Sequence, residues 1–91
     1  MDTLDEAREI IDGIDREMAE LFEKRMTAVG KIAGYKKQNG LDILCRDREN
    51  EIVLKNSELI SDGTIKKYYA DFISGVIELS KKYQKDLIDE K

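Results

Sequence analysis

Apolar residues recur in alternating steps of three and four along the first third of the chain, and no other feature restricts the fold as strongly. The steps run through Leu4, Ala7, Ile11, Ile14, Met18, Leu21, Arg25, Ala28 and Ile32. This spacing places all of them on one stripe of a single helix, like the seam of a heptad repeat. Arg25 is the exception within the stripe, because a permanent cation occupies a position where the pattern predicts an apolar side chain.

Short local signals mark the ends of this helix. Thr3 with Glu6 predicts a capping box at the start, and an Asn-Gly pair ending at Gly40 predicts the stop, so we expect a helix from about Leu4 to Lys37. A helix of about 34 residues is ~50 Å long, whereas a compact globule of this chain length has a radius of gyration near ~12 Å. The helix must therefore overhang its own chain, and a second copy is the economical cover for its stripe.

Two further amphipathic patterns follow the first. One predicts a helix from about Arg46 to Ile60, and after a Ser-Asp-Gly break at 61–63 the other predicts a helix from about Thr64 to Leu87. The sequence has no proline and 40% charged residues, which is typical of long, solvated helices. We expect an all-α fold in which residues 1–91 form a single domain. Its three-helix protomer, with a long first helix, would assemble as an intertwined homodimeric helical bundle.

Charge and composition exclude several classes of function. The net charge is −4, whereas a nucleic-acid surface usually carries a basic excess. No apolar run reaches the roughly eighteen residues of a membrane span. The start, MDTLDEAREI, is acidic and lacks the apolar segment of a secretory signal, and the single Cys45 has no intrachain disulfide partner. We therefore expect a cytoplasmic protein that binds neither nucleic acid nor membrane.

Several polar residues lie on or beside the inward faces of the predicted helices. They are Arg25, Lys36, Arg48, Glu49, Ser80 and Gln84, together with Arg8, which precedes Lys36 by four heptads on the same edge of the seam. Four cations and one carboxylate leave a surplus of positive charge, which is costly to bury. A compact dianion with two carboxylates for the arginines and a hydroxyl for Glu49 would balance this set.

Each residue also has a purely structural interpretation. Arg25 could extend its charged end to solvent or form a buried ion pair with Glu49. Arg48 and Glu49 could be ordinary charges of a first helical turn, and Ser80 and Gln84 a polar patch near a frayed helix end. These interpretations explain the residues one at a time, whereas an anionic ligand explains them together.

Helix geometry limits which of these residues can meet. Arg8 and Arg25 are 17 residues apart, about 25 Å along a straight helix, whereas Arg25 and Lys36 are about 16 Å apart. Long side chains converge across the second distance but not across the first. If Arg8 belongs to the site, it must come from an antiparallel second copy, and a homodimer would then hold two equivalent shared sites.

At these residues the sequence resembles the all-helical chorismate mutases, the AroQ class, over nearly its whole length. The segments that carry the resemblance are AREIIDGIDREMAELFEKR, VGKIAGYKK, RDRENEI and GVIELSKKYQ. The resemblance implies a homodimer that converts chorismate to prephenate on the branch to phenylalanine and tyrosine. This reaction is a rearrangement within one molecule and needs neither a cofactor nor a metal.

The resemblance also implies how the substrate carboxylates are held. Arg25 and Arg48 would bind them together with Arg8, which the partner subunit would supply across the interface. Ser80 would assist.

The remaining roles concern the ring hydroxyl and the ether oxygen of chorismate. Glu49 would accept a hydrogen bond from the hydroxyl, and Lys36 and Gln84 would donate to the ether oxygen. Cys45 stands where the family commonly has aspartate. A backbone N–H contact to the substrate hydroxyl would survive that exchange, whereas a side-chain role of the aspartate would be lost.

Two other functions fit the same pattern. An isochorismate-pyruvate lyase uses the same scaffold and a related cationic pocket, although Ser80 favours the mutase because the lyase pattern is apolar there. A non-catalytic helical dimerisation module would use the charges for packing alone and would bind no dicarboxylate mimic of the transition state. An assay with both substrates discriminates between these functions.

Overall fold

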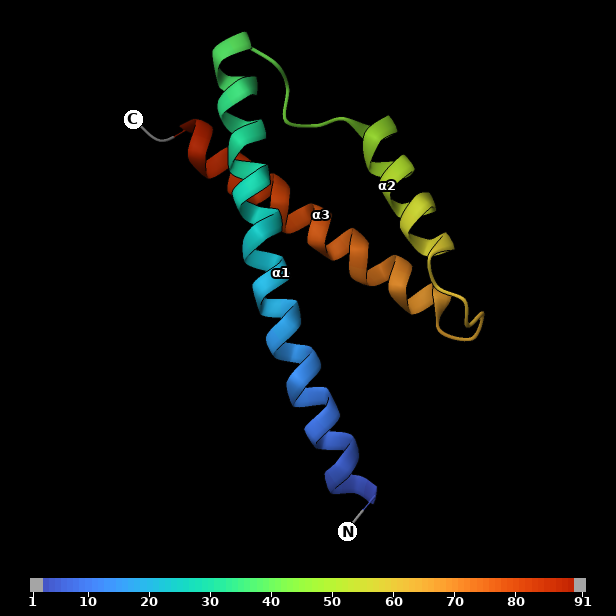
Figure 1. Cartoon of the computed structure of the whole chain (residues 1–91). Coiled ribbons are helices and arrows are strands. Elements are labelled where there is room, and N and C mark those ends of the chain that lie inside the picture. The colour runs from blue at the N-terminus through green and yellow to red at the C-terminus, as the bar shows by residue number, and fades with distance from the viewer. Residues whose placement is uncertain (1–2, 90–91) are drawn as a thin grey trace.

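The computed structural model describes residues 3–89, which form three α-helices and no strand (Figure 1). Helix α1 spans Thr3–Asn39, α2 spans Arg46–Glu58 and α3 spans Lys66–Asp89. The all-α prediction is therefore confirmed over the described part of the chain. The expected single domain also includes residues 1–2 and 90–91, which lie outside the described residues.

Helix α1 is long enough to set the shape of the molecule. Its 37 residues correspond to ~55 Å of helix, and the longest dimension of the molecule is 56 Å. The radius of gyration is 16.5 Å, well above the ~12 Å of a compact globule of this length. In Figure 1 the N-terminal half of α1 extends alone, away from α2 and α3. The predicted overhang is confirmed.

Helix α3 is the element that both other helices contact. It packs against α1 and against α2, while no pair of α-carbons within 8 Å joins α1 to α2 in the described chain (Figure 1). The small core lies where α3 crosses the C-terminal half of α1. Its buried apolar residues are Val29, Ala33, Ile73 and Ile77, and the polar residues Ser80 and Gln84 are buried beside them.

The apolar stripe of α1 is exposed to solvent in the single chain. Its large members in the overhanging half are between 44% and 61% exposed, namely Leu4, Ile11, Ile14, Met18 and Leu21. In the other half of α1, α3 covers Val29 and Ala33, while the stripe residues Ala28 and Ile32 stay exposed. The face that packs inside the protomer is therefore displaced by one residue from the stripe, because α3 approaches α1 from beside it.

Helix α2 ends earlier than its apolar pattern predicts. Ile52, Val53 and Asn56 are half-buried, as expected for an inward face. Leu59, which the apolar spacing of this segment places on the same inward face as Ile52 and Val53, is 76% exposed, so that expectation is wrong. The reason is local, since the helix ends at Glu58 and Leu59 is the capping residue beyond it.

Backbone hydrogen bonds fix the end of α1. Gly40 adopts a left-handed conformation with φ of 62°, and the N–H of Leu41 donates to the carbonyl of Lys36 at 2.9 Å. This is the glycine-terminated cap that the Asn-Gly pair predicts. At the other end the helix already includes Thr3, so Thr3 is not the N-cap that the capping box requires.

The turn before α3 is held by one aspartate. Asp62 Oδ1 accepts hydrogen bonds from Thr64 Oγ1 at 2.7 Å and from the Thr64 N–H at 2.9 Å. These two bonds, the side-chain one first, lower the pKa of Asp62 below its ordinary value. Thr64 therefore belongs to the turn, and α3 begins at Lys66 instead of at Thr64 as expected.

The cap at Gly40 can be tested by comparing two glycines. Gly40→Ala should lower the free energy of unfolding by about 1 kcal/mol, because a Cβ disfavours the left-handed conformation. Gly34 lies within α1, and no heavy atom outside its own helix backbone lies within 4 Å of an added Cβ. Gly34→Ala should therefore raise the free energy of unfolding by about 0.5–1 kcal/mol. Urea denaturation at one fixed protein concentration measures both changes, and effects of equal sign would contradict the cap.

Candidate active site

One cavity gathers most of the residues that the sequence analysis selected. It has a volume of about 390 Å³, within the ~300–1,000 Å³ typical of small-ligand sites. It lies between the C-terminal halves of α1 and α3, the connection 40–45 and the start of α2. Seven of the eight candidate residues line it: Arg25, Lys36, Cys45, Arg48, Glu49, Ser80 and Gln84.

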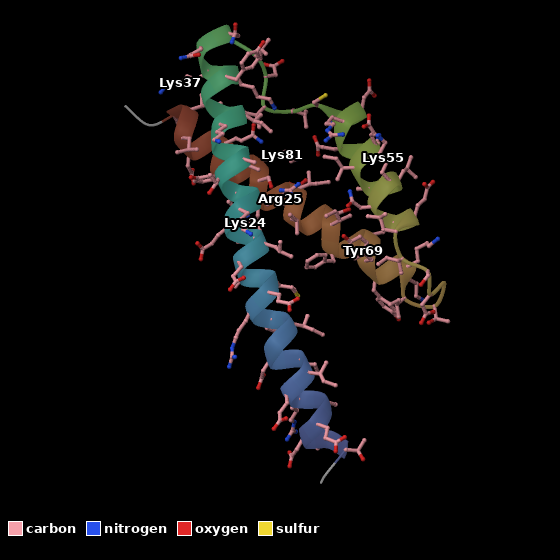
Figure 2. All side chains as sticks on the ribbon, viewed as in Figure 1. Lys24, Arg25, Lys37, Lys55, Tyr69 and Lys81 are labelled. Carbon is pink, nitrogen blue, oxygen red and sulfur yellow. The ribbon has the colours of Figure 1, made fainter. Side chains whose placement is uncertain are left out.

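Arg25 is fixed against α3. It points from α1 toward α3 (Figure 2), and its guanidinium Nη1 donates a hydrogen bond to Ser80 Oγ. Ser80 donates in turn to the carbonyl of Val76, one helical turn earlier, at 2.8 Å. Arg25 is half-buried and Ser80 is 5% exposed. The cation in the apolar stripe is therefore held at the cavity wall by a neutral acceptor, and the alternative of an Arg25–Glu49 ion pair is wrong for the described chain.

Lys36 lies in the last turn of α1, and Cys45 is the last residue of the connection to α2. Lys36 Nζ donates to the carbonyl of Ile43 at 3.0 Å, which ties the connection to α1 and leaves two further N–H donors on the ammonium. Cys45 is the N-cap residue of α2; its carbonyl accepts from the N–H of Glu49 at 3.0 Å, and its side chain makes no capping hydrogen bond. Its free thiol is exposed.

Two buried oxygens at the cavity have no hydrogen-bond partner. Glu49 Oε1 accepts from Lys81 Nζ at 3.0 Å, while Glu49 Oε2 is buried and unpaired. Gln84 is 7% exposed, and its Oε1 is also buried and unpaired. Buried polar atoms are normally satisfied, because leaving one unpaired costs about 1–3 kcal/mol. Two such atoms at one cavity, one on α2 and one on α3, indicate a site built to make polar contacts with a ligand.

Arg48 is held differently from the other cations. Its guanidinium donates to Glu51 Oε1 at 2.8 Å, and its side chain is 60% exposed. Glu51 is shared with Lys55, and the pKa of Glu51 is lowered chiefly by the hydrogen bond and charge of Lys55 and then by Arg48. Exposed ion pairs of this kind contribute little to stability, so an anion in the cavity can draw Arg48 away from Glu51.

The charges around the cavity do not balance. Arg25, Lys36, Arg48 and Lys81 line it together with one carboxylate, that of Glu49. The result is a surplus of three positive charges in a chain whose net charge is −4. A local excess of this kind selects an anionic ligand whatever the net charge of the chain.

Lys81 is the residue that the sequence analysis missed. It follows Ser80 on α3 and lies one residue beside the expected inward face, a position where lysine is an ordinary surface residue. Its partner Glu49 lies on a different helix, so the spacing of residues within α3 could not have identified the contact.

Arg8 lies apart from the cavity. It is an exposed residue near the start of α1 and does not line the cavity of its own chain. Its 17-residue separation from Arg25 corresponds to about 25 Å of helix. The expectation that Arg8 cannot serve the cavity of its own chain is therefore met.

An apolar groove of about 690 Å³ adjoins the site. Its walls come from the stripe of α1 and the facing side of α3, and its larger apolar residues are Met18, Leu21, Phe22, Tyr69, Phe72, Ile73, Val76 and Leu79. Arg25 lines both the groove and the cavity. The groove and the exposed stripe thus form one surface that reaches the edge of the site.

Within residues 3–89, no group of three or more acidic or cysteine side chains could hold a metal ion. None of the described helices is long and apolar enough to cross a membrane.

Comparison with known proteins identifies the family. The sequence profile described as "Chorismate mutase type II" matches residues 7–85, a range that contains all eight candidate residues. The T-protein of Haemophilus influenzae is 41% identical over 49 residues, which are 54% of this chain but only 13% of that protein. No solved structure matches the chain. The profile covers most of the sequence, and the chain belongs to the chorismate mutase type II family.

Proposed function

We propose that the chain is a chorismate mutase, an isomerase that rearranges chorismate to prephenate within one molecule in phenylalanine and tyrosine biosynthesis. Membership of the chorismate mutase type II family supports this activity. The observation that carries the proposal is the cavity in which four cations meet a single carboxylate. Chorismate is a compact dianion with a ring hydroxyl, so its charge and polarity complement that arrangement.

The arginines hold the two carboxylates of the substrate. Ser80 fixes the guanidinium of Arg25, so the remaining N–H groups of Arg25 are oriented before the substrate arrives. Arg48 exchanges the exposed Glu51 for a substrate carboxylate. A guanidinium and a carboxylate can pair through two parallel hydrogen bonds, which fixes direction as well as distance. Holding both carboxylates folds the enolpyruvyl group over the ring, which is the conformer that reacts.

The other polar residues act on the ring hydroxyl and the ether oxygen. Glu49 Oε2 accepts a hydrogen bond from the hydroxyl, and Lys36 and Gln84 donate to the ether oxygen. The C–O bond breaks ahead of C–C bond formation, so negative charge grows on that oxygen, and preorganised donors bind the transition state better than the ground state. A million-fold acceleration requires about 8 kcal/mol, which positioning and electrostatics supply together without a covalent intermediate.

The active unit is a two-fold, intertwined homodimer with shared sites. The exposed stripe of α1 and the apolar groove need a cover that the single chain does not provide. An antiparallel second copy would bury both surfaces. It would also bring Arg8 of the partner subunit to the cavity, where it completes the carboxylate clamp.

A spectrophotometric assay for loss of chorismate tests the activity directly, with isochorismate assayed in parallel for release of pyruvate. We expect prephenate from chorismate and no pyruvate from isochorismate. Pyruvate release without prephenate formation would support the lyase instead. No turnover of either substrate, with no binding of a dicarboxylate mimic of the transition state, would support a non-catalytic dimerisation module.

Gln84→Glu should make the activity fall as the pH rises from acidic to neutral. An ionised carboxylate cannot donate to the ether oxygen and repels the charge that grows there. The unmodified enzyme should lack this decrease, because an amide does not titrate. Rates of chorismate loss measured across that range check the difference, and identical pH profiles would place Gln84 away from the reacting oxygen.

The shared site can be tested by complementation. Arg8→Ala and Arg48→Ala homodimers should each be nearly inactive, because every site lacks one carboxylate clamp. In a mixed dimer, one site combines the intact Arg48 of one chain with the intact Arg8 of the other. Random reassembly after reversible unfolding makes about half of the dimers mixed, so roughly one quarter of all sites should be whole. Activity should recover toward that fraction.

The mixed dimers are isolated through different affinity tags on the two chains. Refolding each variant alone gives the background activity. Well-folded mixed dimers that show no activity above this background would mean that Arg8 does not cross the interface.

A further inference from the structure

One charged residue of the cavity has no part in the proposed mechanism. Lys81 lines the cavity and binds Glu49 Oε1 through its ammonium at 3.0 Å. We propose that Lys81 is a positioning residue that holds this oxygen, so that Glu49 Oε2 remains as the acceptor for the substrate hydroxyl. The inference rests on the proposed function and assigns a specificity role to a residue outside the substrate-binding set.

The Lys81–Glu49 pair differs in kind from the other ion pairs around it. Those of Glu51 with Arg48 and Lys55 lie within α2, and that of Lys81 with Glu78 lies within α3. The Lys81–Glu49 pair joins α2 to α3, and its side chains are only 25% and 22% exposed. Water and salt screen a partly buried pair less than a surface pair. It is therefore the pair best able to fix one side chain relative to another helix.

Lys81 is itself anchored on its outer side. Its ammonium binds the exposed Glu78 at 2.8 Å. The hydrogen bonds to Glu78 and then to Glu49 raise the pKa of Lys81 above its ordinary value, so the ammonium stays protonated at neutral pH. The chain of contacts thus runs from a surface carboxylate through a fixed cation to the carboxylate of the cavity.

Fixing one oxygen of Glu49 has a consequence for recognition. A carboxylate has two equivalent oxygens and rotates about its last bond, whose torsion is broad. Once Lys81 holds Oε1, the plane of the group is set, and the buried Oε2 is the oxygen left without a partner. A single acceptor in a fixed position selects a ligand that places a hydroxyl there. The Lys81 ammonium then acts through Glu49 and needs no contact with the substrate.

Three lysine variants measure this effect. Lys81→Met keeps the length of the side chain and removes the charge, and we expect kcat/KM for chorismate to fall about tenfold. Lys82→Met is the matched control, since the neighbouring Lys82 is exposed, carries the same charge and does not line the cavity. It should change kcat/KM less than about twofold. Lys81→Arg should retain most of the activity of the unmodified chain, because arginine can still donate a hydrogen bond to the Glu49 carboxylate.

A binding experiment separates positioning from general damage. Two bicyclic dicarboxylate mimics of the transition state are compared, one with the ring hydroxyl and one without it. Lys81→Met should weaken binding of the hydroxylated mimic about tenfold and leave the other within about twofold. Equal loss for both mimics would overturn the proposal, because it would mean that Lys81 acts on the carboxylates or on the fold.

A double-mutant cycle with Glu49→Gln completes the test. If Lys81 acts through Glu49, Lys81→Met should cause no further loss of kcat/KM in the Glu49→Gln background. A loss that simply adds to that of Glu49→Gln would mean that Lys81 acts independently, and would overturn the proposal. Circular dichroism monitors helix content. Should Lys81→Met lose helix, Lys81→Ala, which favours the helix and also removes the donor, takes its place in the same cycle with the same two outcomes.

The outcomes also separate this inference from the proposed function. An unmodified chain that does not convert chorismate refutes the proposed function, and the inference falls with it. An active chain in which Lys81→Met behaves like Lys82→Met refutes the inference alone.

Discussion

The length of α1 relative to the rest of the chain is the constraint on which the other features depend. Helix α3 crosses only the C-terminal half of α1, so the buried apolar core of the described chain consists of two residues from each of these helices, Val29, Ala33, Ile73 and Ile77. A chain of this size buries a smaller fraction of its surface on folding than a larger domain does, so a core of four residues gives the single chain little stability. The remaining apolar surface on α1 is the largest unused source of stabilisation, which is the physical reason to propose a second copy as part of the fold.

The same crossing determines where polar groups are buried. Ser80 and Gln84 follow the core residue Ile77 on α3 at helical spacing, so they extend the packed face toward the cavity. An apolar residue at either position would enlarge the core, and the unpaired Gln84 oxygen has a cost in stability. Polar residues at positions that favour apolar ones usually occur at functional sites. Ser80 and Gln84 line the same cavity as the surplus of positive charge.

Helical periodicity explains why so much of this was predictable, and also where the prediction fails. It assigns Arg25, Ser80 and Gln84 to inward faces, and all three line the cavity. Periodicity gives the face of one helix but not the direction from which another helix approaches. It therefore does not indicate that α3 packs on Val29 and Ala33, one residue beside the stripe. One structural interpretation of the sequence paired Glu49 with Arg25, whereas in the structure Glu49 pairs with Lys81. That contact depends on how close α2 lies to α3, which periodicity does not give.

The partners of the four cavity cations divide them into two groups. Arg25 and Lys36 bind neutral oxygens, the Ser80 hydroxyl and the Ile43 carbonyl, so their positions are fixed while their charge is not neutralised. Arg48 and Lys81 bind carboxylates, which offset their charge locally. Because ions screen interactions beyond ~8 Å at physiological ionic strength, the acidic remainder of the chain does little to weaken the field of the first group inside the cavity. An anion therefore meets two preoriented cations first, and the charge of Arg48 becomes available to it only in exchange for Glu51.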